Sequence, residues 1–135
     1  MPILTWNHDL DVGVRAMNDQ HSILMDTQNE LRLAIIRGQG REQVAEIFDR
    51  LIEFTRMHFW SEEQLLEQVN YPQLEEHRAS HHRMLAEMMQ RAHTMLYGEG
   101  SNGRQLLLYL RNSYLAHMEH EDRDYGHYLN EKGIN

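Results

Sequence analysis

Two pairs of possible metal ligands, each spaced four residues apart, constrain this sequence most strongly. His58 is followed by Glu62, and His77 is followed by His81. Because an α-helix turns by about 100° per residue, side chains four positions apart lie within roughly 40° of each other on one face. Each pair can therefore direct two ligand atoms at one point. The spacing predicts a helix at both places and a shared site between them.

Apolar residues at helical spacing predict four helices. The first is expected to begin near residue 20, after a capping Asn18 or Asp19, and to end at Gly38. The other three are expected at residues 41–68, 72–97 and 104–130. Residues 1–17 are expected to form an extended arm that packs over the domain.

The links between these segments are short. Short links make successive helices antiparallel neighbours, so the predicted fold is all-α, an up-down-up-down four-helix bundle with an extended N-terminal arm. A chain of 135 residues is long enough to bury its own core, and we expect a single domain over residues 1–135.

Composition excludes several classes of function. The chain has no cysteine, which rules out disulfides, thiolate zinc sites, iron–sulfur clusters and thiol catalysis. Its formal net charge of −8 repels nucleic acid and anionic lipid. No apolar run approaches the roughly 20 residues that cross a bilayer, and the N-terminus lacks the basic start and apolar stretch of a signal peptide. We expect a cytoplasmic protein with no nucleic-acid partner and no membrane insertion.

Two further histidines fall at the same end of the expected bundle as the ligand pairs. The pairs lie late in the second helix and early in the third, while His21 lies near the start of the first helix and His117 late in the fourth. In an alternating bundle these four places share one end. Nitrogen and carboxylate ligands without a thiolate suit iron, manganese or zinc.

The alternative is that these residues are surface histidines on an acidic protein. One pair at this spacing would be weak evidence for a metal. Two pairs, with partners at the same level on both other helices, are hard to explain by solvation. Buried His and Glu side chains without a metal would leave several polar groups uncompensated in the core. We therefore predict a metal site inside the bundle.

Spacing does not choose the carboxylate that accompanies His117. Glu121 lies four residues further on and shares its face in an α-helix, whereas Asp122 lies five residues further on and about 140° round the helix. From geometry alone Glu121 is the better partner, and both residues stay open at this point.

Longer stretches around these residues form a pattern that covers essentially the whole chain. They are Asn18-Asp19-Gln20-His21, His58-Phe59-Trp60-Ser61-Glu62-Glu63, Tyr71-Pro72 followed by His77 and His81, and His117-Met118-Glu119-His120-Glu121-Asp122 followed by Tyr125 and Leu129. The pattern resembles the hemerythrin family, specifically the small single-domain bacterial hemerythrins. In that family the fourth-helix motif is His-x4-Asp, which makes Asp122 the expected ligand.

The resemblance implies a centre of two non-haem iron ions. One iron would be held by three histidines, His77, His81 and His117. The other would be held by His21 and His58 and keep an open position, where family members bind O2.

The same resemblance assigns the bridges and the function. Glu62 and Asp122 would bridge the two irons together with an oxo or hydroxo group. We expect reversible O2 binding by an oxygen carrier, store or delivery protein rather than an enzyme, with no catalytic residue. An oxygen-consuming enzyme or a reductase is the expected protein partner.

The sequence departs from the family pattern beside the open position. The family has Trp-Leu at the fourth and third positions before the fourth-helix histidine, where this chain has Ser113 and Tyr114. Tyr114 lies one turn from His117 and is expected to point toward the open iron. Its phenol could donate a hydrogen bond to bound O2, block or ligate the iron, or supply a proton and an electron. It could also merely fill the volume that a smaller Ser113 leaves.

These possible roles of Tyr114 lead to an alternative function, and the residues near the ligands predict a pocket. The alternative function is a di-iron oxidase, or an enzyme that handles peroxide or nitric oxide, with Tyr114 at the open iron site. Phe59, Leu24 and Met118 are the expected pocket walls because they adjoin ligands in the sequence. The acidic residues that follow Glu62, including Glu63, are expected to face solvent.

Overall fold

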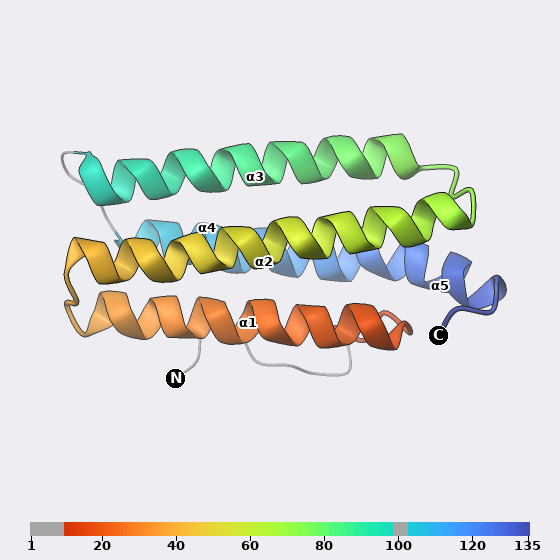
Figure 1. The fold of residues 1–135 in the computed structure, drawn as a ribbon, viewed down its shortest axis with the longest axis horizontal. Helices are drawn as coiled ribbons and strands as arrows, with labels where there is room; N and C mark the ends of the chain where they lie inside the picture. Colours follow the sequence, from red (N-terminus) through yellow and green to blue (C-terminus); the bar gives the residue numbers. More distant parts are fainter. Residues whose placement is uncertain (1–9, 99–102) are drawn as a thin grey trace.

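The computed structural model describes residues 10–98 and 103–135, except for the side chains of residues 120–123. Six helical segments follow one another in this part of the chain: α1 (Arg15–Ile36), α2 (Arg41–Gln68), α3 (Leu74–Tyr97), α4 (Gly103–Ala116), the π-helical turn η2 (His117–Asp122) and α5 (Arg123–Glu131). The last three continue one another, so the segments form four rods (Figure 1).

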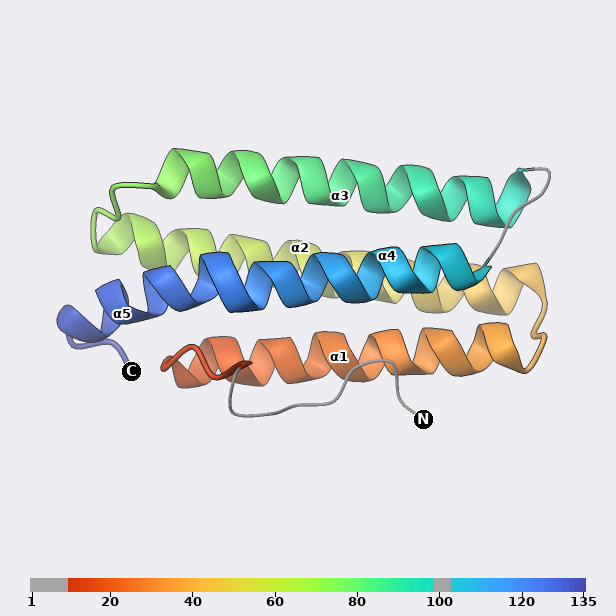
Figure 2. The ribbon, with the colours of Figure 1, turned by 180° about the vertical axis from the view of Figure 1, so that it is seen from behind.

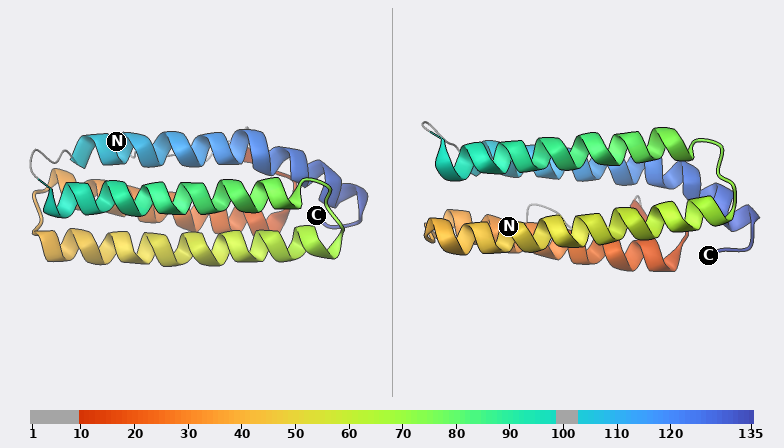
Figure 3. Two further views of the ribbon diagram at one scale, coloured as in Figure 1. Left: turned by 90° about the horizontal axis from the view of Figure 1, so that it is seen from above. Right: turned by 45° about the horizontal axis from the view of Figure 1, so that its top comes forward.

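The rods alternate in direction and form the four-helix bundle that the sequence predicts. In Figure 1, α3 and α1 lie on opposite sides, with α2 in front and α4 behind, and Figure 2 shows α4 from the other side. Each rod contacts the next, and α4 also contacts α1. α2 and α4 therefore face each other diagonally across the core. α5 extends past the end of the bundle (Figure 3).

Two apolar clusters fill the interior, and the expected ligands lie between them. On α2, Ile52 belongs to the larger cluster and Leu66 to the smaller one. On α1, Leu24 belongs to the larger cluster and Met17 to the smaller one. His21 stands between the last two. The ligand layer is thus closed by apolar side chains on both sides, which exclude water from it.

The first helix begins at Arg15 rather than near residue 20. Asn18 is not its cap: the Oδ1 atom of Asn18 accepts from the N–H of Val12 at 3.1 Å, and its Nδ2 donates to Asp11 at 2.8 Å. The side chain thus ties the arm to the helix instead of starting the helix. The arm predicted at residues 1–17 loses its last three residues to α1, and residues 1–9 lie outside the described part.

The remaining boundaries need smaller corrections. α2 runs over the predicted residues, whereas α3 begins at Leu74 because Pro72 and Gln73 form a turn before it. The predicted fourth helix is interrupted by η2. Within residues 10–98 and 103–135, no helix combines the length and the apolar character needed to cross a bilayer.

Gly126 on α5 lies against the backbone of the arm. A Cβ atom at this position would collide with the carbonyl oxygen of Val12, a backbone atom that cannot rotate away. We expect Gly126→Ala to lower the free energy of unfolding by about 1–3 kcal/mol, the usual cost of overpacking. Chemical denaturation of the metal-free protein measures this change. His127→Ala changes the exposed neighbouring position and is the control. An unchanged denaturation midpoint in Gly126→Ala would contradict this packing.

Candidate metal centre

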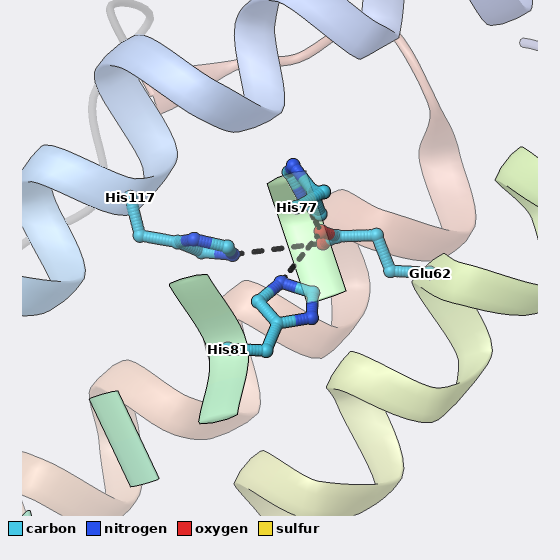
Figure 4. Close-up of side chains that lie close together, drawn as sticks. All are labelled: Glu62, His77, His81 and His117. Carbon is cyan, nitrogen blue, oxygen red and sulfur yellow. Dashed lines mark hydrogen bonds and ion pairs between the residues drawn. The ribbon is translucent and has the colours of Figure 1, made fainter. Parts of the chain in front are cut away.

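Glu62 on α2 lies at the centre of the ligand layer and is fully buried. One carboxylate oxygen, Oε1, contacts Nε2 of His77 and lies 3.1 Å from Nε2 of His81. The other, Oε2, lies 3.1 Å from Nε2 of His58 and 3.7 Å from Nε2 of His117. Figure 4 shows three of these imidazoles, from α3 and from the start of η2, converging on the carboxylate.

His21 joins the layer from α1. Its Nε2 atom lies 3.1 Å from Nε2 of His58. The possible ligand atoms form two groups, each within 4.8 Å: one is His21, His58 and Glu62, and the other is Glu62, His77, His81 and His117. Glu62 belongs to both. The structure thus brings six of the seven predicted ligands together, on the three α-helices and the π-helical turn.

The seventh predicted ligand, Asp122, has a side chain outside the described part of the chain. Its backbone lies in η2, which runs over the six residues His117–Asp122. A π-helical turn is closed by i→i+5 hydrogen bonds and holds more residues than an α-helical turn. Position i+5 is therefore rotated back toward the face of residue i. The wider turn therefore brings Asp122 closer to the face of His117 and weakens the geometric preference for Glu121 that an α-helix would impose.

Two hydrogen bonds orient the imidazoles. Nδ1 of His81 donates to Oε2 of Glu63 at 3.1 Å, because a carboxylate oxygen can only accept. Nδ1 of His58 donates to the amide oxygen of Gln20 at 2.7 Å. An imidazole that holds a metal through Nε2 would keep its proton on Nδ1, so these two acceptors would fix His58 and His81 in the orientation usual for metal-bound histidines.

These two orienting residues, Glu63 and Gln20, were not predicted from the sequence. Glu63 was predicted to face solvent, but its side chain is only 18% exposed and lies between His81 and Arg78. Gln20 directly precedes the ligand His21, and it was noted only as part of the stretch Asn18-Asp19-Gln20-His21. The signal for both was their place directly beside a ligand in the sequence, and a neighbouring helix decides what they contact.

Tyr125 on α5 completes the surroundings of Glu62. Its buried hydroxyl donates to Oε2 of Glu62 at 3.1 Å. Burial by itself raises the pKa of Glu62, but with no metal present the positive charge of protonated His117 and the hydrogen bonds that protonated His58 and His77 donate outweigh it and hold that pKa well below its usual range. Glu62 is thus a carboxylate at neutral pH, as a metal ligand must be.

Loss of an orienting residue should weaken the centre. Glu63→Ala removes the acceptor of His81 and is expected to lower iron affinity about 10–100-fold, measured by competition with a chelator. Glu67→Ala is the matched control, because Glu67 also pairs with Arg78 but is 60% exposed and lies on the solvent side. Equal affinities of the two variants would show that Glu63 does not orient His81.

The expected pocket residues differ in where they lie. Phe59 is buried, and its ring stacks on that of His81 with centroids 3.7 Å apart. Leu24 and Met118 are buried in the larger apolar cluster. Ser113 is half-buried and lines an outer groove of about 380 Å3 between α3 and α4 that also reaches His117.

Tyr114 is buried, and its hydroxyl is hydrogen-bonded to Thr55 on α2. The phenol of this residue therefore has a protein partner across the core. Trp60, which directly follows Phe59, is 64% exposed and is not part of the buried layer.

The donor set fits a resident metal. Five imidazoles and one carboxylate, each at most 6% exposed, meet in a layer closed by apolar clusters. Nitrogen and oxygen donors without a thiolate match the preference of non-haem iron. A buried carboxylate and five imidazoles would be costly to leave without a cation among them.

Fold and site together define a four-helix bundle that binds a metal through histidine and carboxylate side chains. The family model "Hemerythrin HHE cation binding domain" matches residues 12–129. The chain therefore belongs to the hemerythrin family, and its site is a non-haem iron-binding site.

Several relatives support this assignment. The chain is 26% identical to the bacteriohemerythrin of Methylococcus capsulatus over 130 residues, which cover 93% of this chain and 96% of that protein. It is 33% identical to the bacteriohemerythrin of Stenotrophomonas maltophilia over 81 residues, 60% of this chain, and this match spans about half (52%) of the relative. A crystal structure of a leucine-to-tyrosine mutant of hemerythrin superposes with a TM-score of 0.83 at 27% identity, covering 96% of this chain and 98% of that one.

Proposed function

We propose that this protein binds O2 reversibly at a centre of two non-haem irons and acts as an oxygen carrier, store or delivery protein. The observation that carries the proposal is the division of the buried ligands into two groups that share Glu62. One group holds three histidines and the other holds two. A metal with fewer protein ligands keeps room for a small exogenous ligand.

The proposed ligand roles follow from this division. His77, His81 and His117 would hold one iron, and His21 and His58 the other. Glu62 would bridge the irons, with Asp122 as the second bridging carboxylate. When bound, the two ferrous ions would supply one electron each to O2.

The surrounding residues would favour binding over turnover. The carboxylates offset much of the charge of the cations, and the apolar clusters on both sides of the layer keep water out. Tyr125 and Gln20 hold Glu62 and His58 in place. The oxidase alternative rested on the phenol of Tyr114, and that hydroxyl is hydrogen-bonded to Thr55. The cytoplasmic location and the protein partners stay predictions.

An optical experiment tests this function. Anaerobically reduced, iron-loaded protein is measured before O2 is added, after it is added and after it is removed. A visible charge-transfer band that appears with O2 and disappears on its removal is the expected result. Direct passage to a stable diferric spectrum would refute the carrier function, and a bound metal that ignores O2 would indicate a structural site.

A further inference from the structure

Thr55 and Tyr114 form a hydrogen-bonded pair across the bundle. Thr55 is on α2 and Tyr114 on α4, the two rods that face each other diagonally. Both side chains are buried, at 0% and 1% exposure. Thr55 precedes His58 by three residues, and Tyr114 precedes His117 by three. The pair therefore lies one helical turn from the ligand layer, on the side of the larger apolar cluster.

The direction of this hydrogen bond follows from a third group. Oγ1 of Thr55 lies 2.7 Å from the carbonyl oxygen of Leu51, one turn earlier on α2. A carbonyl can only accept, so the single hydroxyl proton of Thr55 goes to Leu51. Thr55 is then left as an acceptor, and the hydroxyl of Tyr114 must be the donor. Two hydrogen bonds thus follow one another: Tyr114 donates to Thr55, and Thr55 donates to the Leu51 carbonyl.

A phenol has one proton, and Tyr114 donates it to Thr55. While this hydrogen bond is present, Tyr114 has no proton left to donate to a ligand on the neighbouring iron. Its oxygen is held against α2 rather than free to approach the metal. Burial also raises the pKa of Tyr114, which disfavours the phenolate that binds ferric iron.

We propose that Thr55 is a positioning residue that holds the hydroxyl of Tyr114 away from the iron, so that Tyr114 presents a ring and not a ligand or a proton donor to the centre. This inference rests on the proposed di-iron function and deepens it. Among the roles that the sequence left open for Tyr114, the proposal selects one: the ring packs beside the open iron position and the phenol takes no part in binding. Without Thr55, the same tyrosine becomes a ligand for the ferric centre.

The test compares Thr55→Val, which keeps the shape but removes the hydroxyl, with Thr55→Ser, which keeps the hydroxyl. Iron-loaded, oxidised samples are examined by visible absorption and resonance Raman. We expect a tyrosinate-to-iron band in Thr55→Val, none in the unaltered protein or Thr55→Ser, and loss of the band when Tyr114→Phe is added to Thr55→Val.

A second readout does not need the metal. The tyrosine Fermi doublet in ultraviolet resonance Raman reports whether a phenol donates or accepts, and the difference from Tyr114→Phe isolates one of the six tyrosines. In the metal-free state, the unaltered protein and Thr55→Ser should show the doublet of a Tyr114 phenol that donates a hydrogen bond. Thr55→Val should not show it.

Three results would overturn the proposal: a tyrosinate band in the unaltered ferric protein, a Thr55→Val variant without the band, or a Tyr114 doublet that Thr55→Val leaves unchanged. Failure of the O2 proposal is distinguishable from these. It would appear as irreversible oxidation or as wrong iron content in the unaltered protein, while the metal-free doublet would still report on the pair.

Discussion

Replacement of Glu62 with glutamine is expected to abolish iron binding. The side chain is fully buried, and both of its oxygens face imidazole nitrogens. Glutamine keeps the shape but removes the negative charge that offsets the cations, and its NH2 group cannot bind a metal. We expect affinity to fall by more than about 100-fold, beyond the range for residues that only orient a ligand. Iron per chain after gel filtration and chelator competition measure the loss.

Glu67→Gln is the control for this change. Glu67 is on the same helix, is 60% exposed and pairs with Arg78 on the surface, so its neutralisation should leave iron content as it was. Circular dichroism of both metal-free variants checks that the helices persist. A Glu62→Gln protein that retains the full iron content would remove Glu62 from the centre.

Asp122→Ala should lose iron, whereas Glu121→Ala should keep it. In a regular α-helix the opposite result would be expected, because position i+4 from His117 shares its face. The π-helical turn over His117–Asp122 rotates position i+5 back toward that face. We expect the Asp122 variant to bind iron at least about 100-fold more weakly, by the same elemental analysis and chelator competition.

The pair of variants provides its own control, since the two residues are adjacent carboxylates in one turn. Equal loss in both would indicate that the turn itself, rather than one carboxylate, supports the centre. Loss in Glu121→Ala alone would contradict both the assigned ligand and the role given to the π-helical register.

Much of the fold and site could be predicted from periodicity. Apolar residues at helical spacing located α2 over its full length, and the ligand pairs His58 with Glu62 and His77 with His81 needed only the turn of an α-helix. Alternation of four helices with short links then placed the ends of α1 and η2 beside them. These features depend on local repeats and on connection length, which the sequence carries directly.

Features that depend on contacts between helices could not be predicted in this way. Glu63 was expected in solvent, yet α3 brings His81 against it. The sequence left several roles open for the phenol of Tyr114, and its hydrogen bond to Thr55 across the bundle could not be predicted. The arm was expected to reach residue 17, yet α1 begins earlier.

The sequence by itself determined which faces of the helices carry the apolar residues and the ligand pairs, because that choice follows from the turn of each helix. It also determined the chemistry of the ligands and the end of the bundle where they meet. Only the tertiary structure decided which atoms touch: the orienting partners of the imidazoles, the extra residue in the turn at His117 and the direction of the Tyr114 hydroxyl. Those depend on the relative rotation and rise of helices that lie far apart in the chain, and no local spacing encodes them.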